Sequence, residues 1–280
     1  MSVKAAATYA ATLGLAVAAC AFPRTCIAQD AAQEGRPLSS PGWVVTIGGW
    51  GNFAPQYQGS NEYVFGGSPI IDVHRQGSRE WLNLPRDGID FELVETKTFR
   101  AGPVATIDWG FGTVDGQRGF KEVAGTGIDL SIEVGAFAEY WPTEFWRTRL
   151  EARNAVYGAE GWVFDLSSDL VWRPDGKWTL AAGPRLSLAD ADYMNAYYGI
   201  DAQQAQASGL PVYDASGGFR SYGAGLLAQY SWNEQFSTMA SFEYERLAGS
   251  AAETPLLDAN GSADQFTFAI GAKYKLVWRR

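Results

Sequence analysis

One side chain of the 280-residue chain has an unperturbed pKa suited to proton transfer near neutral pH, the single histidine His74. A histidine base normally works with a nucleophile such as serine and with an orienting carboxylate. Sequence spacing places no Ser–His–Asp arrangement around His74. We therefore interpret it as a structural polar residue, and a hydrolase built on it is the weaker hypothesis.

The sequence gives little support for a metal-binding or nucleotide-binding site. The two cysteines, Cys20 and Cys26, lie in or beside an N-terminal apolar segment, and one histidine cannot complete the usual zinc ligand set. Asp190, Asp192 and Asp201 could contact calcium, but their spacing differs from that of an EF-hand loop. No Walker A or dinucleotide-binding motif occurs. We expect no metal and no cofactor.

Charged residues recur at alternate positions in two neighbouring segments, 128–140 and 146–156. The candidates are Asp129, Glu133, Glu139, Arg147, Arg149 and Arg153. If both segments are strands of a barrel, opposite charges can pair across them and stiffen the lumen. The same residues could instead line a narrow solute path. The small lumen of a barrel of about 12 strands favours the structural role.

The elements that carry these residues alternate between apolar and polar positions with a period of two, which indicates strands. Segments 162–172 and 266–278 show the same pattern. Trp162 and Trp172 share one face of the first segment, and a tilt of about 45° would separate them by roughly 24 Å along a membrane normal. That spacing is typical of the aromatic girdles of an outer-membrane barrel, whose apolar band is about 25 Å tall.

Connection lengths give a second indication of a membrane barrel. Twelve strands are predicted, with ten as the alternative, at 43–53, 63–74, 79–84, 89–95, 98–109, 127–140, 145–157, 162–172, 177–189, 219–232, 235–247 and 264–278. Short turns follow even-numbered strands, as expected at a periplasmic side. The long connections follow odd-numbered strands and are predicted as outer loops, at 54–62, 110–126, 190–218 and 248–263. Connections 85–88 and 158–161 are short exceptions on the outer side.

Composition and the N-terminus agree with an exported membrane protein. Charged residues make up 19% of the chain, below the usual quarter, and a net charge of −9 argues against nucleic-acid binding. Lys4, an uncharged stretch and Cys26-Ile27-Ala28 predict a cleavable signal peptide over 1–28. A membrane-anchoring helix and lipoprotein processing at Cys20 are weaker alternatives. A periplasmic lead-in over 29–41 and a barrel over 42–280 follow.

Tyrosines gather in or beside the predicted outer loops. They are Tyr57, Tyr63, Tyr193, Tyr197, Tyr198 and Tyr213. Exposed tyrosines suit a surface that contacts a partner. The alternative, slightly favoured for the tyrosines of the 190–218 loop, is that they pack it over the barrel mouth or join the outer girdle.

Four stretches carry a family resemblance: 57–63 with Pro69, 192–213, 244–251 with Pro255, and 265–274. Together they resemble the MltA-interacting protein (MipA/OmpV) family of outer-membrane proteins, and the likeness extends over the chain that follows the signal peptide. The stretch 192–213, which contains Asp192-Tyr193-Met194-Asn195, is the most specific. One departure is Arg279-Arg280 after Trp278, because members usually end on an aromatic residue.

The resemblance implies a non-enzymatic protein of the outer membrane of a Gram-negative bacterium, in contact with its lipid. It further implies a scaffold that holds murein-synthesising and murein-hydrolysing enzymes at this membrane, with a lytic transglycosylase and a murein synthase as partners. The residues themselves leave open a porin-like channel for small polar solutes. An enzyme that uses His74 is a third and weaker hypothesis.

Overall fold

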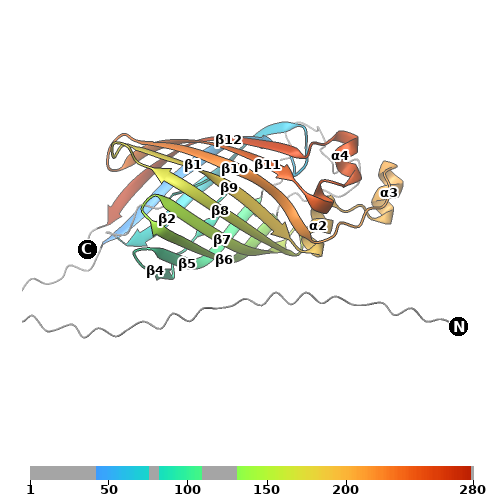
Figure 1. Cartoon of the computed structure of the whole chain (residues 1–280), viewed down its shortest axis with the longest axis horizontal. Coiled ribbons are helices and arrows are strands. Elements are labelled where there is room, and N and C mark those ends of the chain that lie inside the picture. The colour runs from blue at the N-terminus through green and yellow to red at the C-terminus, as the bar shows by residue number, and fades with distance from the viewer. Residues whose placement is uncertain (1–41, 76–81, 109–130, 279–280) are drawn as a thin grey trace, which may run out of the picture. The chain divides into compact units, whose positions relative to one another are not determined.

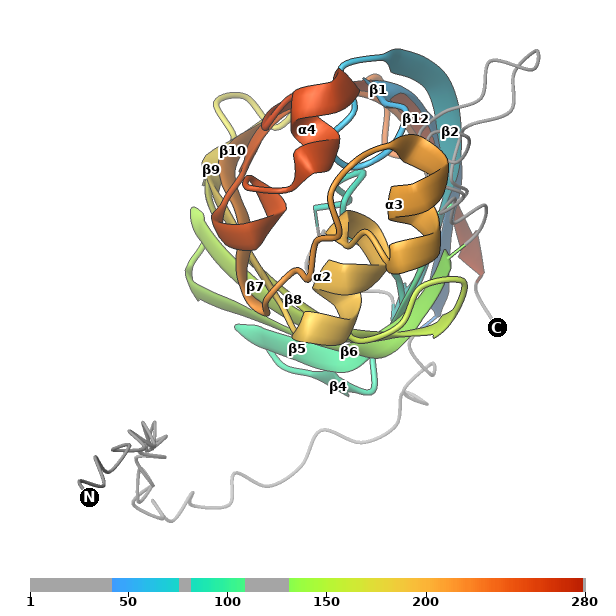
Figure 2. The ribbon, with the colours of Figure 1, turned by 90° about the vertical axis from the view of Figure 1, so that its right-hand side faces the viewer.

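The computed structural model describes residues 42–75, 82–108 and 131–278. Within these ranges, antiparallel strands form a barrel that carries three short helices at one end (Figures 1 and 2). The predicted all-β barrel is confirmed. The predicted signal peptide 1–28, lead-in 29–41, outer loop 110–126 and the pair Arg279-Arg280 lie outside the described residues.

Ten strands of ten or more residues form most of the wall in the described part of the chain. They are β1 Trp43–Pro55, β2 Tyr63–Arg75, β5 Phe99–Asp108, β6 Ser131–Thr143, β7 Trp146–Tyr157, β8 Trp162–Trp172, β9 Trp178–Ala189, β10 Gly218–Ser231, β11 Phe236–Leu247 and β12 Asp264–Trp278. Two short strands, β3 Ile89–Asp90 and β4 Val94–Glu95, both pair with β5.

The strand order shows how the wall is closed. It runs β2-β1-β12-β11-β10-β9-β8-β7-β6-β5-β3, so the first and last long strands are neighbours. β1 and β12 pair from Trp43↔Trp278 to Phe53↔Phe268. β2 and β3 end the order, and their Cα atoms come within 8 Å of each other.

Strand alternation sorts side chains between lumen and lipid. In β8, Asp165 and Asp169 are buried inside, whereas Leu166 and Leu170 are exposed outside. Trp162 and Trp172, at the two ends of β8, are 45% and 63% exposed, as girdle residues should be.

The predicted strand 79–84 is wrong over its described part, because residues 82–84 form no strand and Leu82 and Leu84 are buried. The chain instead turns into the lumen over residues 82–88, which we call the inward segment. The predicted outer connection 85–88 therefore also lies inside. The next predicted strand, 89–95, is present as β3 and β4, joined along β5 by the bonds Phe91 N to Pro103 O and Leu93 N to Ala101 O, both 3.1 Å.

One end of the barrel, the helix end, bears α2 Ala191–Tyr198, α3 Ala202–Ser208, η1 Gly249–Ala251 and α4 Pro255–Asn260 (Figure 1). The opposite turn end has the connections 144–145, 173–177 and 232–235 and the end of β12. The sequence pattern did not predict these helices, because they are short and lie within the long loops. Among the described residues, no helix has both the length and the apolarity that a membrane crossing requires.

Candidate functional site: the charged lumen

The predicted lumen charges lie on the inner face of β6 and β7. Glu133, Glu139, Arg147, Arg149 and Arg153 are between 0 and 7% exposed. Asp129 lies outside the described residues. Buried charges are tolerated only when counter-charges and hydrogen bonds satisfy them, so the partners of each residue decide what this site can do.

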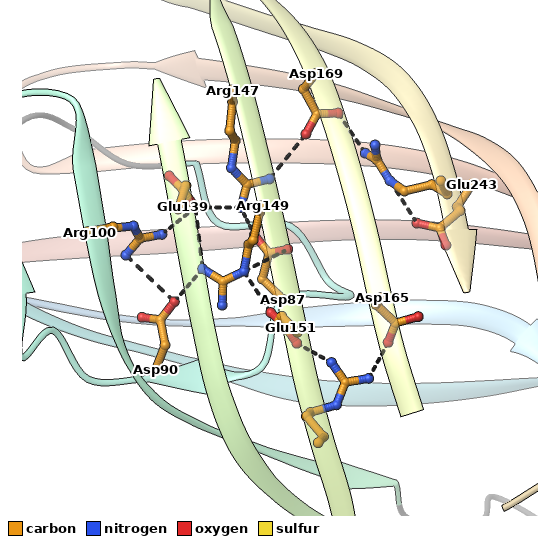
Figure 3. Close-up of polar contacts among 12 residues, drawn as sticks. Asp87, Asp90, Arg100, Glu139, Arg147, Arg149, Glu151, Asp165, Asp169 and Glu243 are labelled. Carbon is orange, nitrogen blue, oxygen red and sulfur yellow. Dashed lines mark hydrogen bonds and ion pairs between the residues drawn. The ribbon is translucent and has the colours of Figure 1, made fainter. Parts of the chain in front are cut away.

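Glu139 is the centre of the cluster (Figure 3). Its Oε2 accepts hydrogen bonds from Arg100 at 3.0 Å, Arg147 at 2.9 Å and Arg149 at 3.3 Å, and its Oε1 accepts one from the Trp141 indole at 2.7 Å. One carboxylate therefore joins β5, β6 and β7.

Ion pairs continue around the inner wall from this centre. Arg147 bonds to Asp169 of β8 at 3.1 Å, and the other oxygen of Asp169 contacts Arg185 of β9 at 2.8 Å. Arg185 in turn lies 3.9 Å from Glu243 of β11. Figure 3 shows this chain of alternating charges across the sheet. The pairing stiffens the wall and leaves little unbalanced charge along it.

A second group surrounds Arg153. Its guanidinium bonds to Glu133 at 2.9 Å, to Asp165 at 2.5 Å and to Glu151. The cavity beside this group, lined by Arg86, Arg149 and Asp165 among others, measures only about 10 Å³. Such a space holds one water at most.

The inward segment crosses the lumen and joins these groups. Arg86 bonds to Asp165 of β8 at 2.8 Å, to Glu245 of β11 at 2.9 Å and to Glu243. The next residue, Asp87, accepts a hydrogen bond from Arg147 at 2.6 Å.

The inward segment makes a third contact with the wall through Asn83. Its Oδ1 accepts a hydrogen bond from Lys273 Nζ of β12 at 3.0 Å. The segment is therefore held inside the barrel by contacts with several strands of the wall.

The loop tyrosines close the helix end. Tyr193 and Tyr198 of α2 are 2% and 1% exposed, and the Tyr198 hydroxyl donates to Gln58 Oε1 at 2.7 Å. Arg220 of β10 donates to the same oxygen at 2.9 Å, and Tyr193 donates to Glu133 at 3.3 Å. Burial raises the pKa of both phenols above their usual value.

The other predicted loop tyrosines are less buried. Tyr213 donates to the carbonyl of Ser250 at 2.8 Å, and Tyr63 accepts from Phe266 N at 3.2 Å. The ring of Tyr197 is tilted against that of Tyr193, with centroids 4.6 Å apart. Tyr57 is half-buried. These contacts favour a packing role over a partner surface.

Two of the three acidic residues considered for calcium, Asp190 and Asp201, have other partners. Asp190 caps α2 by accepting from Tyr193 N at 2.9 Å, and Asp201 caps α3 through a capping box with Gln204.

The family follows from a comparison with known proteins. The family model of the MltA-interacting protein MipA matches residues 47–276. The chain belongs to the MipA family. The resemblance seen in the sequence is confirmed, and an outer-membrane location follows from it and from the relatives below.

A curated relative of this MipA-family chain is the "Putative outer membrane protein YiaT" of Escherichia coli K12, 30% identical over 126 residues. That match covers 44% of the chain and 48% of the relative, so the chain spans about half the length of the curated protein it matches. The same protein of Escherichia coli O157:H7 matches equally.

Two solved barrels are similar in structure. The COG4313 outer-membrane channel of Pseudomonas putida F1 has a TM-score of 0.44 at 11% identity, covering 87% of this chain and all of that one. The NanC porin has a TM-score of 0.39 at 10% identity, covering 84% of this chain and all of the porin.

The stretches that carry the MipA resemblance meet at the helix end. Gln58 of the first stretch bonds to Tyr198 of the second, and Tyr213 of the second bonds to Ser250 of the third. Gly59 N donates to Gln265 Oε1 of the fourth at 3.1 Å. The stretches that resemble the family thus pack together and cover the helix end of the barrel.

Sequence reasoning missed part of the lumen site, namely Arg86, Asp87, Asp90, Arg100, Arg185, Arg220, Glu243 and Glu245. Alternation could have indicated the arginines, since Arg185 and Arg220 are buried beside lipid-facing neighbours such as Phe219. The single histidine, His74, pairs with Asp72 at 3.1 Å inside the turn end of β2.

Proposed function

We propose that this chain is a non-conducting outer-membrane scaffold that holds murein-synthesising and murein-hydrolysing enzymes at the membrane. The observation that carries the non-conducting part is the inward segment, whose Arg86 reaches Asp165, Glu243 and Glu245 across the lumen. A channel needs a continuous path, and this segment occupies it. The murein link is supported by the name of the family, MltA-interacting protein.

The partner-binding surface would be the turn end. In the proposed orientation the short turns face the periplasm, where murein lies. The turn 173–177 between β8 and β9 is fully exposed and carries Arg173, Asp175 and Lys177. Aromatic residues such as Phe145 and Trp232 are exposed at the same end. Exposed aromatic residues and arginine are enriched where proteins bind each other.

Crosslinking in living cells followed by purification tests this function. We expect a lytic transglycosylase and a murein synthase to co-purify with the wild-type chain. The double variant Arg173→Glu, Lys177→Glu should lose them, because it reverses the charge of the turn. The matched control, Gln203→Glu with Gln206→Glu on exposed α3 of the helix end, should retain them.

Recovery of no murein enzyme by the wild-type chain would contradict the scaffold. Solute conduction would favour the alternative, a porin-like channel for small polar solutes. The enzyme hypothesis is tested separately by His74→Ala, which we expect to change no hydrolytic activity, because Asp72 gives His74 a structural partner.

A further inference from the structure

The wall has one seam, where β2 faces β3 and the chain that follows it up to β4. Within the described residues β2 pairs only with β1, and both β3 and β4 pair only with β5. Elsewhere in the strand order, each neighbouring pair is joined by a backbone ladder.

A cavity of about 100 Å³ lies at this seam. Its lining includes Trp50, Ile70, Leu82 and Leu84, which are buried on the lumen side. It also includes Ile71, Ile89 and Ile107, which are 49%, 36% and 38% exposed on the lipid side. Side chains of both faces of the wall, those toward the lumen and those toward the lipid, therefore border the cavity.

Three polar side chains of its lining are already engaged by other parts of the barrel. Asp87 binds Arg147 at 2.6 Å, and Asp90 binds Arg149 at 2.8 Å. Asn83 binds Lys273 at 3.0 Å. Apart from Ser68 and Thr106, whose Oγ1 is buried without a hydrogen-bond partner, the side chains left to contact an occupant are apolar. Water would find few hydrogen-bond partners among them, and an empty cavity would forfeit their dispersion contacts.

A second cavity, of about 400 Å³, continues along the seam toward the turn end. On β2 the lining passes from 68–71 in the first cavity to Val73 and His74 in the second. On the facing chain it passes from 87–90 to 91–93 and Glu95, so the second cavity also has acidic lining at Glu92 and Glu95. The two cavities are thus consecutive along one line that leads from the turn end into the apolar band.

We propose that the seam binds one acyl chain of a membrane phospholipid, which enters from the turn end and inserts its terminal carbons beside Trp50. A cavity of about 150 Å³ holds benzene, so about 100 Å³ accommodates the last few carbons of a chain. The bilayer is the material in contact with Ile71, Ile89 and Ile107. This inference does not depend on the scaffold function.

Trp50 provides a direct probe. It is 5% exposed and lies seven residues from Trp43, hence roughly 17 Å along the membrane normal from the turn-end girdle. Fluorescence is measured for the full chain in vesicles of phosphatidylcholine, plain or brominated near the methyl ends of its acyl chains. The contribution of Trp50 is the difference between the wild-type chain and Trp50→Phe, and we expect brominated lipid to remove most of it.

Ala105→Phe places a ring on the outer face of β5 at the cavity lining and should restore the Trp50 emission. Ala136→Phe, on the outer face of β6 away from the seam, is the matched control and should leave the quenching unchanged. A heat-dependent shift in electrophoretic mobility verifies that each variant is folded.

Equal Trp50 emission in plain and brominated vesicles would overturn the proposal, as would quenching that persists in Ala105→Phe. Quenching of Trp50 by aqueous acrylamide but not by brominated lipid would show a water-filled seam and would also overturn it. If Ala105→Phe does not fold, the comparison of the wild-type chain with Trp50→Phe in the two lipids still tests whether an acyl chain contacts Trp50.

Discussion

Arg86 and Asp165 are 79 positions apart in the sequence, and their side chains meet at 2.8 Å inside the barrel. This ion pair fastens the inward segment to the opposite wall. Asp165 also binds Arg153, so the segment is joined to the charge network of β7 and β8. The proposed closure of the lumen thus depends in part on the side chain of Arg86.

Arg86→Ala should loosen the inward segment, which then keeps its contacts through Asp87 and Asn83. Asp165 and Glu245 keep Arg220 within 3.6 and 3.4 Å, so the wall should remain folded while the tether is lost. We expect liposomes with the variant to swell in small sugars, unlike those with the wild-type chain. Arg246→Ala is the control, since its pair with Asp264 is about 40% exposed and exposed pairs contribute little. Unchanged permeability of Arg86→Ala would show that the Arg86 contacts are not what keeps the lumen closed.

Glu139→Gln should destabilise the barrel strongly. The substitution removes the charge that balances Arg100, Arg147 and Arg149, all buried, and breaking a buried pair costs about 3–5 kcal/mol. The measurement is the denaturant midpoint of the folded band in unboiled electrophoresis. Glu144→Gln, in an exposed turn, should leave the midpoint in place. Equal midpoints for both variants would refute a structural role for the network.

A third prediction concerns close strand contact. A Cβ at Gly183 of β9 would lie 1.7 Å from the Ser168 carbonyl oxygen of β8, so Gly183→Ala should prevent assembly of the heat-modifiable barrel. At Gly51 the nearest atom, the Ile270 carbonyl oxygen, is 3.9 Å away, so Gly51→Ala should assemble normally. Pulse-labelled outer-membrane fractions distinguish the two. Normal assembly of Gly183→Ala would mean that β8 and β9 are not so close.

The fourth prediction is a pH dependence at the helix end. Burial holds the pKa of Tyr193 and Tyr198 above 10.0, so their neutral phenols stabilise the loop fully below pH 10. That stabilisation is lost as the pH rises beyond 10 toward the folded-state pKa. In an absorbance titration of the tyrosines, the latest phase should shrink in Tyr193→Phe with Tyr198→Phe. If the double variant instead lost only absorbance that titrates near pH 10, this result would contradict the burial of Tyr193 and Tyr198.

The sequence pattern located most strands because a half-buried strand alternates wherever one face contacts lipid. Segment 162–172, predicted from its tryptophans and aspartates, coincides with β8. The inward segment could not be recognised this way, because Leu82-Asn83-Leu84 also alternates. Its position depends on the carboxylates that Arg86 contacts, and these lie on strands that are distant in the sequence.

The partners within the charge network were likewise beyond sequence reasoning. Alternation indicates which residues share a face, but register decides which of them meet. Glu139 lies opposite Arg149 in the ladder, yet its shorter bond is to Arg147. Arg100 reaches the same carboxylate from a third strand, β5.

The central claim, a closed barrel, is tested most directly by planar-bilayer recording of purified wild-type protein that shows the heat-dependent mobility shift. The closed lumen predicts no stepwise conductance at any moderate voltage. Reproducible unitary steps, with a selectivity altered by Arg147 or Arg153 substitutions, would contradict it and identify a channel.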